Sequence, residues 1–178
     1  MNWDAIGAIG EIIGAAAVLI TLIAIYFQQR KIHALSRAEN QRQILTSTRD
    51  LMEFVSVHPS ALESIRQCLQ SYDDASPQAQ ADFSNYSHAF VNLAEQAQYL
   101  YRDSLINKAS YEGLENLALM LLATPGGSQW WQYGRVAFGT DIRDPLDRLL
   151  HSRREGAVLL WDVLPYLAPD QDETATNS

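Results

Sequence analysis

The residue best placed to do chemistry in this sequence is an acid in an otherwise apolar stretch. Glu11 is the only charged side chain in the 22 residues from Ile6 to Phe27. A charged carboxylate in hydrocarbon costs several kcal/mol and normally faces protein or water. Such a carboxyl group can hydrogen-bond to a neighbouring helix, or several copies can form an acidic ring that selects cations.

Small residues share one helical face with Glu11. In a helix, this face carries a stripe of seven residues: Asp4, Gly7, Glu11, Gly14, Val18, Thr21 and Ile25. Gly10, Ala17 and Ala24 lie beside the stripe, and Gly10 with Gly14 forms the GxxxG spacing that is common where membrane helices pack closely. We predict a self-association surface made of Gly7, Gly10, Glu11, Gly14, Ala17 and Thr21.

The sequence leaves three environments open for Glu11. It lies only seven residues after Asp4, so it can reach headgroups or water at the outer interface. It can also form a pair or ring in a homo-oligomer, or be covered by a different protein. Because the chain contains one apolar span, any protein surface that shelters this carboxyl group must come from another chain.

The apolar stretch predicts a transmembrane helix within residues 1–27. At ~1.5 Å rise per residue it reaches ~33 Å, which is enough to cross a hydrocarbon core of ~30 Å. A buried helix of a soluble protein would be shorter and interrupted by polar residues. A cleaved signal peptide would begin with basic residues, whereas residues 1–4 contain none. We therefore expect a retained span.

The charges that flank the span predict its orientation. Asp4 precedes the span without any base, and Arg30, Lys31 and Arg37 follow it. The positive-inside rule then places the N-terminus outside and the rest of the chain in the cytoplasm. We expect Arg30, Lys31 and Arg37 to contact anionic lipid headgroups. The single cysteine, Cys68, agrees with a reducing compartment.

A helical pattern continues beyond the span. Residues 28–58 contain no glycine or proline, which predicts that the span continues into a juxtamembrane helix. The residues that keep a helical period there are Leu35, Ala38, Arg42, Leu45, Met52 and Val55.

Residues 59–168 are predicted to form a small cytoplasmic bundle of four or five shorter helices. Proline or a capping residue marks each expected start: Pro59, Pro77, Ser110, Thr124 with Pro125, and Asp144 with Pro145. No stretch outside the span reads as a strand, so the predicted fold is all-α. Val158–Leu167 is apolar enough for a last core helix or for an interfacial one. Residues 169–178 are polar and acidic, which predicts a disordered tail that the fold does not need.

Composition argues against several classes of function. The 178 residues carry a net charge of −8, and the part after Arg49 has 18 acids and 8 bases, so we expect no nucleic-acid partner. One cysteine excludes an intrachain disulfide and a multi-cysteine metal site. The histidines fall on separate predicted elements: His33, His58, His88 and His151. Without a recognised catalytic or phosphate-binding motif, the sequence predicts no catalytic residue, no metal and no cofactor.

Four remaining features have ordinary structural interpretations. Cys68 is expected to be a buried thiol, and Gly126–Gly127 a turn. Trp130–Trp131 is expected to place one ring in the core and one at its edge. The last feature is a set of residues on adjacent turns of one predicted helix, interpreted as an internal polar network or a solvated face: Glu95, Tyr99 and Arg102.

The first 15 residues resemble the opening of a widespread family of bacterial proteins whose activity is unassigned. The family pattern W-x-A-I-G-A-I-G-E-I-x-G-A is matched by Trp3–Ala15, and an apolar run and a Gln/Arg-rich helix follow. A looser similarity covers an aromatic helix with Glu95 and Tyr99, then Pro125–Gly126 and Trp130–Trp131. The resemblance implies a membrane-anchored helical protein of the bacterial inner membrane, and it supplies no catalytic residues.

Two functions from different classes fit these observations. The first is a scaffold or interaction protein that self-associates in the membrane and presents helices to a cytoplasmic protein partner. The second is a homo-oligomeric ion-conducting or gating assembly with Glu11 facing the pore. Glycine and alanine on the same face favour tight helix contact over an open channel. An enzyme is a third possibility that no motif supports.

The predicted orientation has a direct test. A reporter fused after Ser178 should be active only in forms that work in the cytoplasm, because the basic flank holds the C-terminal part inside. Activity of a periplasm-dependent reporter at the same position would refute this topology.

Overall fold

The computed structural model describes residues 3–152 and 157–169, and the side chains of the first helix from Glu11 onward, Ile12 excepted. These residues form seven α-helices and two short 3-10 segments, with no strand among them. The prediction of an all-α fold is therefore confirmed. Of the predicted disordered tail, 169–178, all but Pro169 lies outside the described residues.

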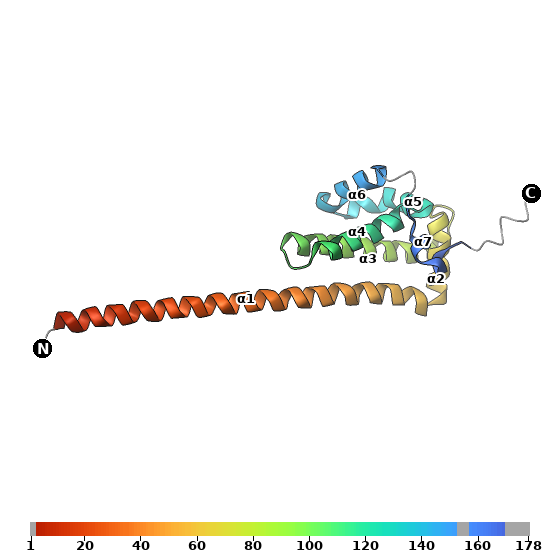
Figure 1. Ribbon diagram of the computed structural model, residues 1–178. Coiled ribbons are helices and arrows are strands. Elements are labelled where there is room, and N and C mark those ends of the chain that lie inside the picture. Colours follow the sequence, from red (N-terminus) through yellow and green to blue (C-terminus); the bar gives the residue numbers. More distant parts are fainter. Residues whose placement is uncertain (1–2, 153–156, 170–178) are drawn as a thin grey trace, which may run out of the picture.

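The first helix, α1 (Trp3–Val57), contains 55 residues and projects as a single rod beyond the rest of the molecule (Figure 1). At ~1.5 Å per residue it is about 80 Å long. Neither glycine nor proline occurs between Ala15 and Val57, so nothing interrupts the hydrogen-bond ladder. The helix ends where His58 takes an extended conformation before Pro59, as the residue preceding a proline prefers.

The N-terminal part of α1 is long and apolar enough to cross a membrane, and no residue of its most apolar window is buried inside the molecule. Burial begins only at Ser36, from which point one side of the helix contacts other elements. Ile44 and Val55 are the fully buried side chains on that side, with exposed fractions of 2% and 0%.

Four of the six periodic residues predicted for this part of α1 are exposed and do not belong to its packed face: Leu35, Ala38, Arg42 and Leu45. Leu35 and Leu45 are 61% and 62% exposed, whereas Ile44, which the periodic set omitted, is buried. The packed face also carries half-buried polar residues, including Gln41 and Thr48. Because polar side chains occupy both faces, apolar spacing alone does not reveal which side packs.

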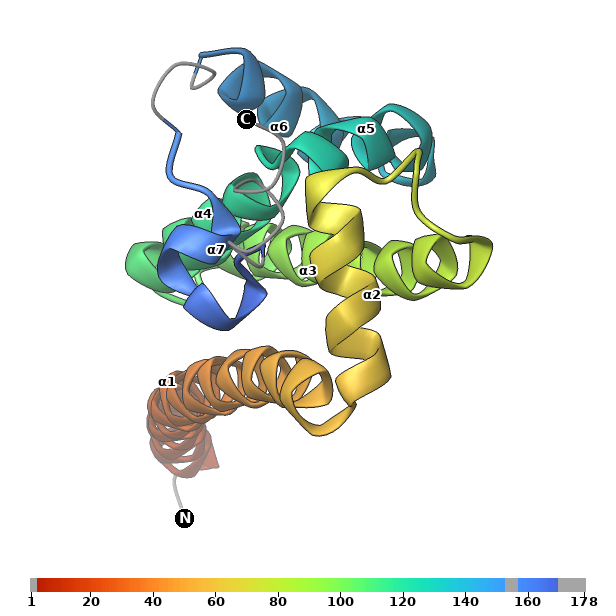
Figure 2. The ribbon, with the colours of Figure 1, turned by 90° about the vertical axis from the view of Figure 1, so that its right-hand side faces the viewer.

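The helices that follow pack together on one side of the C-terminal half of α1 (Figures 1 and 2). The longest of them, α3, lies beside α1 and also packs against α2, α4 and α5. Their bounds are α2 (Pro59–Gln70), α3 (Pro77–Arg102), α4 (Lys108–Leu122), α5 (Pro125–Gly134), η1 (Arg135–Ala137), α6 (Thr140–Ser152), α7 (Leu160–Val163) and η2 (Pro165–Leu167).

Most helix starts follow the predicted capping residues. Pro59, Pro77 and Pro125 occupy first-turn positions, and the Thr124 hydroxyl accepts a hydrogen bond from the Gly127 amide at 3.0 Å. The predicted cap at Ser110 is wrong. Helix α4 begins at Lys108, because the Asn107 side-chain oxygen accepts from the Ser110 amide at 2.8 Å and so acts as the cap.

The predicted start of α6 at Asp144–Pro145 is also wrong, since the helix begins at Thr140 and contains Pro145 in its interior. Proline has no amide hydrogen, so the carbonyl of Asp141 loses its usual helical donor. Gln98 of α3 donates its side-chain amide to that carbonyl at 2.9 Å, and Arg102 forms an ion pair with the Asp141 carboxylate at 2.8 Å. A contact from α3 thus supplies the hydrogen-bond donor that the Asp141 carbonyl oxygen lacks because of the proline.

The main core is formed by α2, α3, α4, α5 and α6, with one buried residue each from α1, α7 and η2. Trp130 and Trp131 are both buried in it, so the expectation that one ring lies at the edge is wrong. The indole N–H of Trp131 donates to the Asp147 carboxylate at 2.8 Å, which allows the second ring to be buried with its polar atom satisfied. Val158–Leu167 packs in the core through Leu160 and Leu167, as one of its two predicted placements required.

A smaller cluster joins α1 to the hairpin of α3 and α4. Its buried members are Ile44, Leu93, Ala97, Ile106 and Leu114. Because Ile44 is the one described residue of α1 in this cluster, few apolar contacts hold this part of the long helix in place.

The Gly126–Gly127 pair lies in the first turn of α5 rather than in a plain loop. A β-carbon at Gly126 would collide with the carbonyl oxygen of Cys68 at the end of α2, and one at Gly127 with the carbonyl oxygen of Leu121. The two glycines therefore permit backbone-to-backbone approach of α5 to both α2 and α4.

This close approach predicts opposite effects for two glycine substitutions. Gly126→Ala should lower stability by about 2 kcal/mol or more, because backbone must shift to admit the methyl group. Gly113→Ala, in α4 with open space around it, should raise stability by roughly 0.5–1 kcal/mol through helix propensity. Melting temperatures of the detergent-solubilised full chain would measure both. Equal melting temperatures for the two variants would contradict the packing.

Candidate functional site

The predicted self-association surface lies on the projecting part of α1. Its members with described side chains, Glu11, Gly14, Ala17 and Thr21, are all exposed. Gly7 and Gly10 fall where the side-chain environment lies outside the described residues. A β-carbon built on Gly14 would meet no atom within 4 Å, so this face is open in the single chain. The Thr21 hydroxyl donates to the carbonyl of Ala17 at 2.8 Å, which satisfies it within its own helix.

No part of the described chain covers this surface. From Glu11 to Leu35, every residue whose side chain is described is exposed. This stretch includes large apolar side chains on all sides of the helix: Ile13, Val18, Leu19, Ile20, Leu22, Ile23, Ile25, Tyr26, Phe27, Ile32 and Leu35. Apolar surface of this extent requires lipid or protein around it.

Ile32 and Leu35 are exposed apolar residues that the predicted surface did not include. The signal that could have found them is a seven-residue spacing. Ile32 lies seven residues after Ile25, and Leu35 lies fourteen after Thr21, in the same stripe as Glu11. This stretch of α1 therefore carries the stripe past the end of the apolar run.

The three predicted headgroup-contact residues have different environments. Arg30 and Lys31 are exposed, and the Arg30 guanidinium lies 5.8 Å from the centroid of the Tyr26 ring, within cation–π range. Arg37 donates its Nε to the carbonyl of Ser104 at 3.1 Å, in the turn between α3 and α4. Arg37 therefore ties α1 to the C-terminal helices, and contact of the three residues with lipid stays a prediction.

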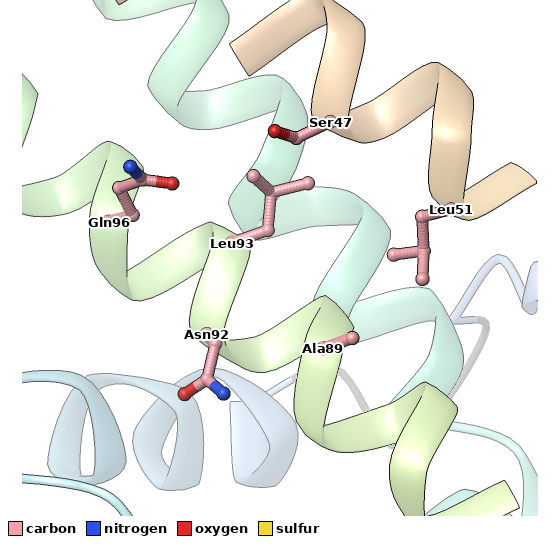
Figure 3. Close-up of a pocket in the computed structure, with 6 residues that line it drawn as sticks. All are labelled: Ser47, Leu51, Ala89, Asn92, Leu93 and Gln96. Carbon is pink, nitrogen blue, oxygen red and sulfur yellow. The ribbon is translucent and has the colours of Figure 1, made fainter. Parts of the chain in front are cut away.

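Two small cavities lie beside α1, and neither offers catalytic chemistry. One, of about 220 Å³, is lined by Ser47 and Leu51 of α1 and by four residues of α3 (Figure 3), and no lining residue is titratable. The other, of about 200 Å³, lies at the α3–α4 turn beside Arg37 and Lys108. The Lys108 ammonium is 2.9 Å from the Glu112 carboxylate, so its charge is already balanced.

The potential nucleophile and metal ligands do not assemble into a site. Cys68 is buried, as predicted, and burial together with the nearby Asp82 carboxylate raises the pKa of its thiol from 9.0 to about 12. Within residues 3–152 and 157–169, no group of three His, Cys, Asp or Glu residues is placed to hold a metal ion. Arg102, from the predicted Glu95–Tyr99–Arg102 set, pairs with Asp141 of α6 and lies over the Tyr99 ring, which makes it a structural contact.

Comparison with known proteins adds no assignment: no family model, curated protein or solved structure matched this chain. The functional argument therefore depends on the surfaces described above.

The burial of Cys68 predicts slow alkylation in the folded protein. At pH 8, a shift of the thiol pKa from 9.0 to about 12 lowers the thiolate fraction roughly a thousandfold. Iodoacetamide should therefore label the native chain far more slowly than the chain unfolded in urea, as followed by mass spectrometry. Equal labelling rates at pH 8 would show that the thiol is accessible and would contradict its place in the core.

Proposed function

We propose that the protein is a membrane-anchored scaffold that self-associates through α1 and presents its C-terminal helices to proteins in the cytoplasm. The observation that carries this proposal is the uncovered apolar helix, which has no partner from Glu11 to Leu35 within its own described chain. In this proposal the protein lies in the inner membrane of a bacterium, with its N-terminus outside and with Arg30 and Lys31 at the cytoplasmic headgroups.

Self-association is supported by the chemistry of one face of the span. Gly14 leaves a gap that lipid chains fill poorly and that a second helix backbone can enter. The Glu11 carboxyl group, on the same face, requires a polar partner if it lies within the hydrocarbon. Within residues 3–152 and 157–169, α1 is the one candidate span, so no second membrane helix among them supplies either contact. Another copy of α1 supplies both at the same depth.

The C-terminal helices are suited to presentation rather than to catalysis. They contain a core with two large buried indoles, and their only potential nucleophilic thiol is buried. Their attachment to α1 includes the Arg37–Ser104 hydrogen bond and a second one from the Gln41 amide to the Ser110 hydroxyl at 2.6 Å. These contacts fix the helices relative to the membrane anchor, which is what a scaffold requires.

A second candidate function, an ion-conducting assembly, is favoured by the exposure of Glu11 in an apolar helix. Rings of acidic side chains select cations. Conductance measured across bilayers that contain the purified protein separates the two candidates. If the protein is a scaffold, neither the wild type nor Glu11→Gln should conduct ions, and both should assemble. If it is a channel, the wild type should conduct, and Glu11→Gln should assemble but carry no current.

Enlarging Gly14 tests the proposed contact. Gly14→Leu should shift the protein in mild detergent from oligomer to monomer, because the leucine side chain separates helix backbones that pack through small residues. In the single chain this substitution meets open space and favours helix, so a loss of assembly reports on another copy. Light scattering over a range of concentrations is the measurement.

Ala16→Leu provides the matched control for this experiment. Ala16 is also exposed in α1, and at about 100° per residue it lies roughly 160° around the helix from Gly14. It should assemble as the wild type does. A wild-type protein that stays monomeric at all concentrations, or a Gly14→Leu variant that assembles normally, would refute self-association through this face.

A further inference from the structure

The stripe that contains Glu11 does not end with the apolar run. From Glu11 onward its members alternate in spacing by three and four residues, which is the seven-residue repeat of a coiled coil. The series is Glu11, Gly14, Val18, Thr21, Ile25, Gln28, Ile32 and Leu35. Since α1 is one unbroken helix over all of these positions, the stripe continues from the span into the segment that follows and turns about the helix axis by only ~20° per seven residues.

The segment 28–35, called the stalk below, separates the apolar run from the packed part of α1. It extends for about 12 Å at ~1.5 Å per residue, and every one of its side chains is exposed. Leu35 lies nine residues, or about two and a half turns, before Ile44, so it points to the side opposite the C-terminal helices. The view along α1 shows these helices on one side only (Figure 2). The stripe is therefore accessible along the stalk.

Lipid does not account for the apolar residues of the stalk. A helix that crosses the membrane leads away from its surface, and the headgroup layer adds only ~5–7 Å on each side of the hydrocarbon core. Taking Phe27, the end of the predicted span, as the boundary of the hydrocarbon core, Ile32 and Leu35 lie five and eight residues beyond it, or ~8 and ~12 Å along the helix. At these distances from the hydrocarbon core the two side chains lie beyond the headgroup layer, so they contact protein or water and not lipid.

The residue types along the stripe favour a second, parallel copy of the same helix. In the seven-residue repeat, Val18, Ile25 and Ile32 occupy one core position, and Gly14, Thr21, Gln28 and Leu35 occupy the other. Branched residues at the first core position favour two parallel strands, and within the stalk Leu35 is the leucine that such pairs favour at the second. Copies of one single-span chain share their orientation in the membrane, so their α1 helices are parallel.

The charges beyond Leu35 mark the end of the contact in such a pair. The next two positions of the stripe are Glu39 and Arg42, which form an exposed ion pair at 2.8 Å within the chain. In an in-register parallel pair each core position faces its own copy, so Glu39 would meet Glu39 and Arg42 would meet Arg42. These like charges disfavour close packing there, so the contact that we infer ends at Leu35.

We propose that two copies of this chain pack through their stalks as a parallel, in-register, two-stranded coiled coil, with Gln28, Ile32 and Leu35 at the contact. This inference rests on the proposed self-association of the span and extends it past the membrane. The partner is a second copy because the stalk stripe has the same register as the span stripe, and only an identical helix at the same depth presents matching core positions to both. The pair holds the two sets of C-terminal helices on its outer sides.

Disulfide scanning in native membranes tests this contact. Three variants each place a single cysteine in the stalk stripe: Gln28→Cys, Ile32→Cys and Leu35→Cys. Two matched controls, His33→Cys and Ala34→Cys, place the cysteine on exposed positions of other faces. Cys68 is buried and stays in place, so the wild-type chain gives the background. Brief oxidation with copper phenanthroline should convert the three stripe variants to dimers at least fivefold more than the two controls.

Span variants make the two proposals separable. Thr21→Cys and Ile25→Cys report on the membrane contact in the same oxidation. If they form dimers while positions 28, 32 and 35 cross-link no more than 33 and 34, the stalk contact is refuted and self-association of the span stands. If neither set forms dimers, both proposals are refuted. Cross-links from the stripe to a protein of different mass would overturn the assignment of the partner as a second copy.

Discussion

The continuity of α1 is the constraint on which the rest of the structure depends. A helix without glycine or proline between Ala15 and Val57 behaves as one rigid element, so the direction of any side chain fixes the direction of all others. The face that contacts the C-terminal helices and the stripe that carries Glu11 are thereby held on different sides of the same rod. A break or kink between them would uncouple the membrane contact from the placement of the helices beyond it.

Helix α3 organises the part of the molecule that α1 carries. It packs against α2, α4 and α1, and its C-terminal end supplies Gln98 and Arg102 to the α6 helix. The same helix provides Leu93 and Ala97 to the small cluster around Ile44. Because α3 contributes to both hydrophobic clusters, it links the C-terminal helices to α1, together with the packing of α2 on the end of α1.

The contrast between the two halves of α1 explains why function is sought on its surface. The C-terminal half is covered on one side by apolar and hydrogen-bonding partners, and its polar groups at Arg37 and Gln41 are used in holding the chain together. The N-terminal half is apolar, and its described side chains from Glu11 onward are uncovered. In the packed part, the Cys68 thiol is buried, and the cavity between α1 and α3 is lined by residues without titratable side chains. Neither feature offers a functional surface comparable to the exposed face of α1.

The sequence by itself determined the helical class, the long apolar helix, the proline and Thr124 starts of α2, α3 and α5, and the burial of Cys68, because these depend on local propensity and composition. It also identified the stripe around Glu11, whose spacing is a property of one helix. It did not determine which side of α1 packs, since Gln41, Ser47 and Thr48 weaken the apolar pattern.

Only the tertiary structure decided several other features. A donor from α3 allows Pro145 inside α6, the Asp147 carboxylate allows Trp131 to be buried, and Asn107 replaces Ser110 as the cap of α4. The placement of Pro145 and the burial of Trp131 both depend on residues far apart in the sequence. In each case the tertiary contact gives a hydrogen-bond partner to a polar atom that has none within its own helix.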